Sequence, residues 1–196
     1  PLFTVETFRP VREADIIGFT LQHELNYTTV LNMLDLAGLA VRASQRHSPW
    51  PLVIAGGEGA LSPEVLSPFI DAFVLGDGEE VLLEILECVA RLKQRPSVSK
   101  DDILAALARI EGVYVPSRVE FDYAPDGTIA CWRSIRSGSS DRSDIGPKCS
   151  SDGIFHRRTF DLASDDGPTG PIVPLSRIVH DRFVIEIRRG CTRGCR

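Results

Sequence analysis

The sequence predicts an α/β fold, in which helices cover both faces of a doubly wound parallel sheet. Over the first 96 residues, short apolar segments alternate with longer segments of helical periodicity. The apolar segments lack the polar–apolar alternation of a half-exposed strand. A continuous apolar run of this kind is typical of strands buried on both faces. Glycines follow two of these segments directly, at the edge where such sheets bind ligands.

Three apolar segments are predicted to contain the strands of this sheet. Each is short, and glycine, proline or a charged residue bounds it. They fall within residues 14–21, 51–55 and 71–75, and a further short strand is predicted at 112–116. A hairpin is predicted next, because segments 119–123 and 128–132 flank Pro125-Asp126-Gly127, a sequence that favours a tight turn.

Four segments are predicted to be helices, at residues 27–39, 63–69, 79–93 and 99–110. Ser62 is placed as the N-cap of the second, with Pro63 at the first helical position. Ser99 is placed to cap the fourth, whose first turn is acidic. Asp77 is a natural N-cap for the third, and Glu80 completes something close to a capping box. The third helix has one apolar face, formed by Val81, Leu82, Ile85, Leu86, Val89 and Leu92.

Composition divides the chain into four predicted parts. Residues 1–96 form the α/β domain, and residues 97–133 add a helix and a hairpin. Residues 134–171 are rich in Ser, Gly, Asp and Arg without periodicity, so we expect a flexible linker there. Residues 172–196 begin a further domain, whose first strand at 182–188 leads directly into two cysteines.

Charge and cysteine content exclude several classes of protein. The net charge of −5 and the pI near 5.4 argue against a nucleic-acid binder that works through bulk charge. No apolar run is long enough to span a bilayer, and the first residues do not resemble a signal peptide. The five widely spaced cysteines indicate a reducing cytoplasm. Because the chain lacks an initiating methionine and stops within a motif, we expect a fragment.

The terminal cysteines, Cys191 and Cys195, are the strongest chemical signal in the chain. They are spaced C-x-x-x-C within an Arg-Gly-Cys-x-x-Gly-Cys segment that follows a predicted strand. Thiolates are the ligands that hold iron–sulfur clusters, and nearby arginines favour the thiolate form. The alternative is that two unrelated cysteines lie in an arginine-rich loop.

This segment resembles the start of the radical S-adenosylmethionine (SAM) signature, C-x-x-x-C-x-x-C, which follows the first strand of a partial (β/α) barrel. The resemblance implies a [4Fe–4S] cluster held by Cys191, Cys195 and a third cysteine three positions past Cys195, beyond the end of the chain. It implies that SAM binds the cluster and yields a 5′-deoxyadenosyl radical. An electron donor such as flavodoxin or ferredoxin is implied too. Residues 172–196 would then be the truncated start of the barrel, and this piece alone should be inactive.

The upstream domain resembles the cobalamin-binding-like, Rossmann-like domain that precedes the barrel in one branch of radical SAM proteins. Segments 17–22, 52–57 and 71–80 carry this resemblance. It implies cofactor contacts from the loops after the strands, at Thr20, Leu21, Gly56, Gly57, Gly76, Asp77, Gly78 and Glu79. Ordinary turn and helix-cap chemistry explains the same glycines equally well.

Whether cobalamin is bound is left open by the sequence. None of His23, His47, His156 and His180 lies in the Asp-x-His-x-x-Gly motif whose histidine ligates cobalt in the base-off mode. With cobalamin, the resemblance implies radical methyl transfer to an unactivated carbon; without it, sulfur insertion or radical rearrangement. Two other functions stay open: a non-catalytic flavodoxin-like module that binds cobalamin or a nucleotide, and a zinc-binding interaction domain. The substrate stays unnamed.

Overall fold

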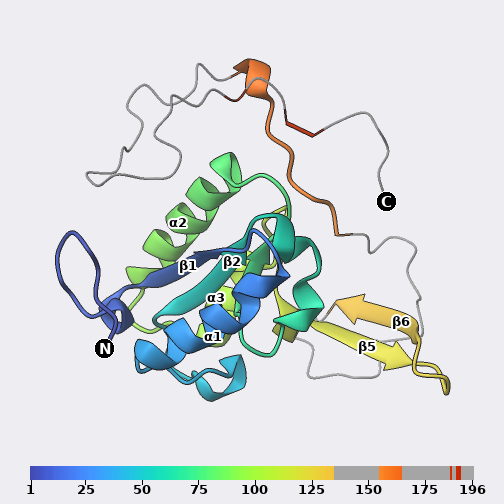
Figure 1. Ribbon diagram of the computed structural model, residues 1–196, viewed down its shortest axis with the longest axis horizontal. Helices are drawn as coiled ribbons and strands as arrows, with labels where there is room; N and C mark the ends of the chain where they lie inside the picture. Colours follow the sequence, from blue (N-terminus) through green and yellow to red (C-terminus); the bar gives the residue numbers. More distant parts are fainter. Residues whose placement is uncertain (135–154, 165–185, 187–188, 191–196) are drawn as a thin grey trace. The chain divides into compact units, whose positions relative to one another are not determined.

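The computed structural model describes residues 1–134, 155–164, 186 and 189–190 (Figure 1). The chain divides into two units, Pro1–Thr159 and Phe160–Arg196. In the second unit, the described residues include the short 3-10 helix η8, Leu162–Ser164. Arg189 there pairs with Glu186 at 2.8 Å, and its guanidinium lies 6.0 Å from the centre of the Phe160 ring.

The first unit is built on a four-stranded sheet whose strands lie in the order β1-β2-β3-β4. The strands are β1, Ile16–Thr20; β2, Leu52–Gly56; β3, Ala72–Val74; and β4, Val113–Tyr114. The first three are parallel, and β4 is antiparallel to β3. The α/β class is therefore confirmed, but the sheet is mixed rather than wholly parallel.

The reversed direction of β4 follows from the two helices that precede it, α2, Glu79–Lys93, and α3, Lys100–Leu107. The chain leaves the carboxyl end of β3 into α2 and enters α3 beside Asp71, at the amino end of β3. It then returns to the carboxyl end, where Leu75 donates to the carbonyl of Gly112 at 2.7 Å. A strand that starts at that edge must run antiparallel to β3.

Helices cover both faces of the sheet, as predicted. Alternate residues of β2 point to opposite faces. Leu52 and Ile54 pack with α2 and α3, whereas Val53 and Ala55 pack on the side of α1, Tyr27–Leu36. Residues of α3 and β4 belong to the same core as β1, β2 and β3, so residues 97–115 fold together with the first 96.

Helix α2 has the predicted bounds but not the whole of the predicted apolar face. Leu82 and Leu86 are 44% and 45% exposed, and the buried stripe includes Cys88 instead. The predicted N-cap is also wrong, because Gly78 occupies that position and makes no side-chain cap. Asp77 lies one residue too early, and its backbone N–H bonds outside the helix, to the carbonyl of Arg158.

The other helices differ from prediction mainly at their ends. Ser99 caps α3 through a complete capping box with Asp102, as predicted. Segment 63–69 holds only the 3-10 turn η5, Pro63–Val65, and the side chain of Ser62 makes no cap bond. Helix α1 ends at Leu36 rather than at residue 39, because Gly38 takes a φ of 72° and turns the chain away. The further 3-10 turns are η1, Val11–Glu13; η2, Glu24–Asn26; η3, Ala43–Gln45; η4, Glu58–Leu61; and η6, Pro116–Arg118.

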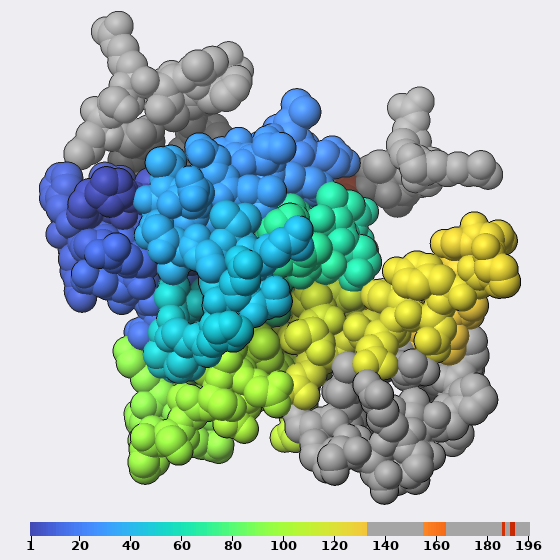
Figure 2. All heavy atoms as spheres, turned by 90° about the horizontal axis from the view of Figure 1, so that it is seen from below, coloured from blue at the N-terminus to red at the C-terminus, as the bar shows by residue number. Residues whose placement is uncertain are grey.

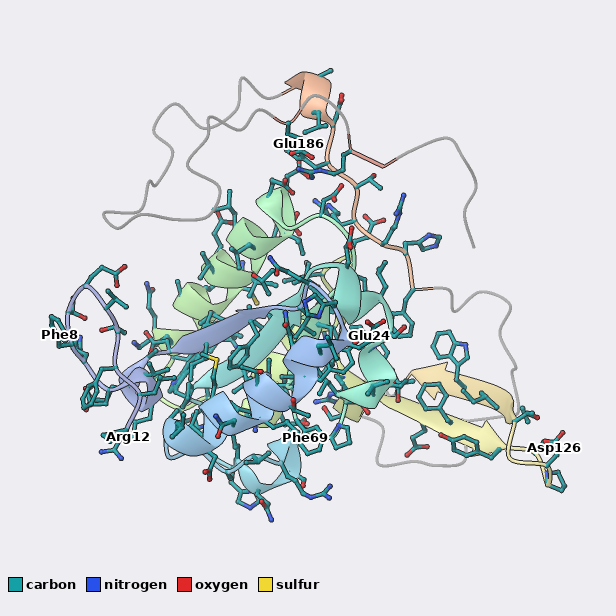
Figure 3. The ribbon with its side chains drawn as sticks, in the orientation of Figure 1. Phe8, Arg12, Glu24, Phe69, Asp126 and Glu186 are labelled. Atoms are coloured by element: carbon teal, nitrogen blue, oxygen red, sulfur yellow. The ribbon has the colours of Figure 1, made fainter. Side chains whose placement is uncertain are left out.

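The predicted hairpin is present as β5, Val119–Tyr123, and β6, Ile129–Ser134. Gly127 supplies the positive φ of 83° in its turn, and the Asp126 carboxylate accepts from the backbone N–H of Thr128 at 3.0 Å. Figure 3 shows Asp126 at the hairpin tip. Part of the predicted linker, residues 155–164, is described, whereas 135–154 and 165–171 lie outside the described residues. The described helices are all too short or too polar to cross a membrane.

Candidate functional site

The candidate site is the edge of the sheet at which the parallel strands end. We call it the carboxyl edge and define it as segments 20–27, 56–61 and 75–80. Thr20 lies opposite Gly56 in the register of β1 and β2, and Ala55 lies opposite Phe73 in that of β2 and β3. The eight predicted cofactor residues therefore gather at this single edge, as the topology requires.

The segments after β1 and β2 hold each other through their backbones. Leu21 donates to the carbonyl of Gly56 at 2.7 Å, and Gly59 donates to the carbonyl of Leu21 at 2.8 Å. The Tyr27 hydroxyl donates to the carbonyl of Gly59, also at 2.8 Å. Leu21 is fully buried, so its side chain belongs to the core rather than to an open site.

This close approach explains why the loop after β2 needs glycines. Gly57 has a φ of 94°, and a Cβ there would lie 2.7 Å from the Leu21 carbonyl oxygen. A Cβ at Gly59 would lie 3.0 Å from that of Leu21. The backbone that approaches these glycines is thus that of Leu21, the residue directly after β1. Contact of Gly56 and Gly57 with a cofactor stays a prediction.

The end of β3 is covered by a segment from the predicted linker. We call residues 155–158 the strap. The backbone N–H of Arg158 donates to the carbonyl of Leu75 at 2.7 Å, and its carbonyl accepts from Asp77 at 3.0 Å. These two bonds extend the sheet by a parallel bridge between Arg158 and Gly76. A Cβ at Gly76 would lie 2.1 Å from the Arg158 carbonyl oxygen, so only glycine fits there.

The side chain of Arg158 is enclosed by three carboxylates. Its guanidinium lies 2.5 Å from Glu84, 3.2 Å from Glu80 and 3.9 Å from Glu111. The hydrogen bond with Glu80, followed by the negative charge of Glu84, raises the pKa of Arg158. The strap therefore brings a permanent positive charge to an acidic part of the carboxyl edge.

Aromatic stacking fixes the other end of the strap. The ring of Phe155 stacks on Trp132 at a centroid distance of 5.0 Å and meets Tyr114 edge-on at 4.8 Å. Tyr114 belongs to β4 and Trp132 to β6, so Phe155 ties the hairpin to the sheet. The strap is thus held by its backbone, an ion cluster and an aromatic contact.

Part of the carboxyl edge stays accessible. Thr20, Gly78 and Glu79 are exposed, and nothing lies within 4 Å of a Cβ built at Gly78. Leu25 and Leu61, in η2 and η4, are 83% and 54% exposed. Figure 3 labels Glu24 in the same turn as Leu25. This exposed part combines acidic and apolar side chains, which suits contact with another domain as well as with a ligand.

The predicted metal ligands, Cys191 and Cys195, lie outside the described residues. Within the described part, no group of three or more His, Cys, Asp or Glu side chains could hold a metal ion. Cys88 is buried in α2, and Cys131 is half-buried in β6. Neither of these two cysteines lies in such a group.

Sequence reasoning missed two charged sites. Arg158 was assigned to a linker, although Phe155 and Phe160 flank it with apolar residues that a linker rarely contains. The second site is a buried ion cluster of Arg46, Asp71 and Lys100. Its only sequence signal is Asp71 itself, a charged residue directly before a fully apolar strand.

A comparison with protein families assigns the chain to one family. The family described as the N-terminal part of radical SAM proteins matches residues 1–116. The chain belongs to this family. The matched region of this radical SAM protein contains the whole four-stranded sheet with α1, α2 and α3, and it ends where η6 begins. No curated protein and no solved structure matches the chain.

Proposed function

We propose that this chain is the front part of a radical SAM enzyme, which carries a [4Fe–4S] cluster and SAM. The observation that supports the proposal is the family match over the complete sheet domain. The C-x-x-x-C spacing of Cys191 and Cys195 agrees with it, because thiolates are the donors that such clusters need. Cys191 and Cys195 would hold the cluster, which when bound would supply the one-electron chemistry that activates SAM toward the substrate.

The chain's own residues have two roles in this proposal. Cys191 and Cys195 supply two of the three thiolates, and Arg193 between them favours the thiolate form. The carboxyl edge, with exposed Leu25 and Leu61, offers an apolar surface to a ligand or a partner. A reduced flavodoxin or ferredoxin in the cytoplasm provides the electron.

Cobalamin is not given a role in this proposal. The backbone of Leu21 already fills the space beside Gly57, and Arg158 fills the space beside Gly76. The described strands also follow one another in the order β1-β2-β3-β4, without the reversal that opens a ligand crevice in doubly wound sheets. The glycines thus offer cobalamin no preformed cradle among the described residues. Methyl transfer through cobalamin would need the accessible part around Gly78.

The deciding experiment is anaerobic cluster reconstitution of the full-length protein, read by iron and cobalt content. We expect about four irons per chain, as one [4Fe–4S] cluster requires, and their loss in Cys191→Ala. Cys131→Ala is the control and should keep its iron. A folded protein without iron would overturn the proposal and favour a non-catalytic binding module, and bound zinc would favour an interaction domain. Bound cobalt alongside iron would make methyl transfer the leading chemistry.

A further inference from the structure

A pocket of about 670 Å³ opens at the opposite, amino edge of the sheet, away from the candidate site. Segments 42–47, 64–71, 99–104 and 116–121 contribute to its lining. Figure 2 shows the 42–47 segment, light blue to cyan, and the yellow-green region around residue 116 on one face of the molecule. Its volume is in the range of sites for small organic ligands, which is about 300–1,000 Å³.

The pocket contains a buried cluster of three charged side chains. One carboxylate oxygen of Asp71 lies 3.1 Å from the Arg46 guanidinium and 2.9 Å from the Lys100 ammonium. The other oxygen of Asp71 accepts from the backbone N–H of Val53 at 2.9 Å. The Asp71 and Arg46 side chains are only 2% and 5% exposed, and that of Lys100 is 12% exposed. One carboxylate thus faces two cations, and the cluster has a net charge of +1.

The cluster also has an unused donor. The terminal nitrogens of Arg46 bond to Asp71 and to the carbonyls of Ala40, Val41 and Phe69. Its Nε is buried and has no hydrogen-bond partner among the described residues. Burial lowers the pKa of Lys100, although Asp71 raises it through a hydrogen bond. An additional anion in the pocket would reduce the electrostatic cost of the second cation.

The rest of the lining is compatible with an anion that has an apolar body. The amino end of α3 opens onto the pocket at Ser99 and Lys100, and a helix amino terminus favours negative charge. The two other carboxylates of the lining are engaged, Glu64 by the Tyr114 hydroxyl and Asp101 by Arg118. The apolar wall is formed by Pro68, Ile70, Leu104, Pro116, Val119 and Phe121.

We propose that this pocket is a binding site for a small organic anion. The ligand would have a phosphate or carboxylate group and an apolar body. The oxyanion would lie against Arg46 and Lys100, and the apolar body would lie along the wall beside Val119 and Phe121. The lining of this site contains no cysteine and none of the eight predicted cofactor residues.

The test is calorimetric titration of the full-length protein with phenyl phosphate, benzoate and phenol. We expect one of the two anions to bind and phenol, which lacks the charge, not to bind; the preferred anion distinguishes phosphate from carboxylate. Lys100→Met should weaken binding about tenfold or more, the loss expected for one charge-assisted hydrogen bond. Lys93→Met is the matched control, because Lys93 pairs with Asp15 at an exposed position outside the pocket lining.

A second variant keeps the test valid if Lys100→Met does not fold. Ser117 is exposed and lines the pocket, so Ser117→Trp should fill the space and abolish binding without changing a charge. Ser62→Trp, at an exposed residue outside the pocket lining, should bind as the unmodified protein does. The proposal is overturned if neither anion binds at millimolar concentration, or if Ser117→Trp binds the anion as tightly as Ser62→Trp.

Discussion

The backbone nitrogen of Arg158 lies 2.7 Å from the carbonyl oxygen of Leu75, and through this bond the strap pairs with the end of β3. This bond and the one that Asp77 donates to the Arg158 carbonyl place part of the predicted linker at the carboxyl edge. The family resemblance implies a cofactor at the same edge. The strap therefore determines which part of the carboxyl edge a ligand or a neighbouring domain can reach.

Replacing Gly76 tests how tightly the strap is held. Gly76→Ala and Gly127→Ala both place a side chain at a positive φ, 99° and 83° respectively. Only at Gly76 does the new Cβ meet another backbone, that of Arg158. We expect the free energy of unfolding to fall by about 1–2 kcal/mol in both variants, because the new side chain strains a left-handed backbone. Only Gly76→Ala should show a further loss. Urea unfolding and amide exchange at Arg158 measure this difference. Equal losses would mean that the strap does not press on Gly76.

Replacing Arg158 tests the ion cluster. Arg158→Met leaves the strap backbone intact but removes the cation between Glu80, Glu84 and Glu111. Because these carboxylates are partly exposed, we expect only a small loss of stability, which shrinks as salt is added. Arg91→Met, at an exposed residue of α2, is the control. A large loss that salt does not change would contradict this account.

Asp71 should be the most sensitive charged residue of the first unit. Asp71→Asn leaves Arg46 and Lys100 buried without a counter-charge, and breaking such a pair costs roughly 3–5 kcal/mol. Asp15→Asn removes only the exposed pair with Lys93 and should cost less than about 1 kcal/mol. Denaturant unfolding of the two variants measures both values. Similar losses would show that the buried cluster contributes no more than a surface pair.

Gly57 should be needed for folding whether or not a cofactor is present. Gly57→Ala places a Cβ against the Leu21 carbonyl, so we expect the cofactor-free protein to be destabilised. Gly78→Ala has open space around the new atom and should be nearly neutral. Thermal unfolding of the two variants compares them. A Gly57→Ala protein of unchanged stability that loses only cofactor binding would instead support a cofactor contact.

The capping box of α3 predicts a specific dependence on pH. The hydrogen bond from the Ser99 hydroxyl, followed by that from the Ser99 backbone, lowers the pKa of Asp102 below the ordinary aspartate value of 3.8. A lowered pKa in the folded state stabilises the protein above pH 3.8, and this contribution is lost as the pH falls through the folded-state value. Unfolding measured from pH 5 downwards should therefore be less pH-dependent in Ser99→Ala. An unchanged slope would show that the Ser99 hydroxyl does not lower the pKa of Asp102.

Sequence reasoning succeeded where structure depends on neighbours along the chain. The bounds of α2 follow from its apolar stripe, and the α3 cap follows from the short-range pairing of Ser99 with Asp102. The α/β class, and helices on both faces, follow from the alternation of apolar segments.

The features that were missed depend on residues far apart in sequence. The direction of β4 follows from how α2 and α3 pack, which no local pattern records. Arg158 meets Glu80 across 78 positions, and Lys100 bonds to the carbonyl of Arg46 across 54. Leu82 and Leu86 match helical periodicity as well as Val81 does, so periodicity alone could not show that they are exposed. The proposed cluster residues Cys191 and Cys195 stay predictions.

The strap also sets an order of events during synthesis. A ribosome adds roughly 5–20 residues each second, and domains generally fold from the amino terminus as they emerge. The core of β1 to β4 is complete once residue 115 has emerged, whereas Arg158 follows Glu80 by 78 positions. For several seconds, therefore, the backbone groups of Leu75 and Asp77 cannot yet bond to Arg158, although the core is already folded. During that interval the backbone of Leu75 and Gly76 is open to a chaperone or to a second nascent chain.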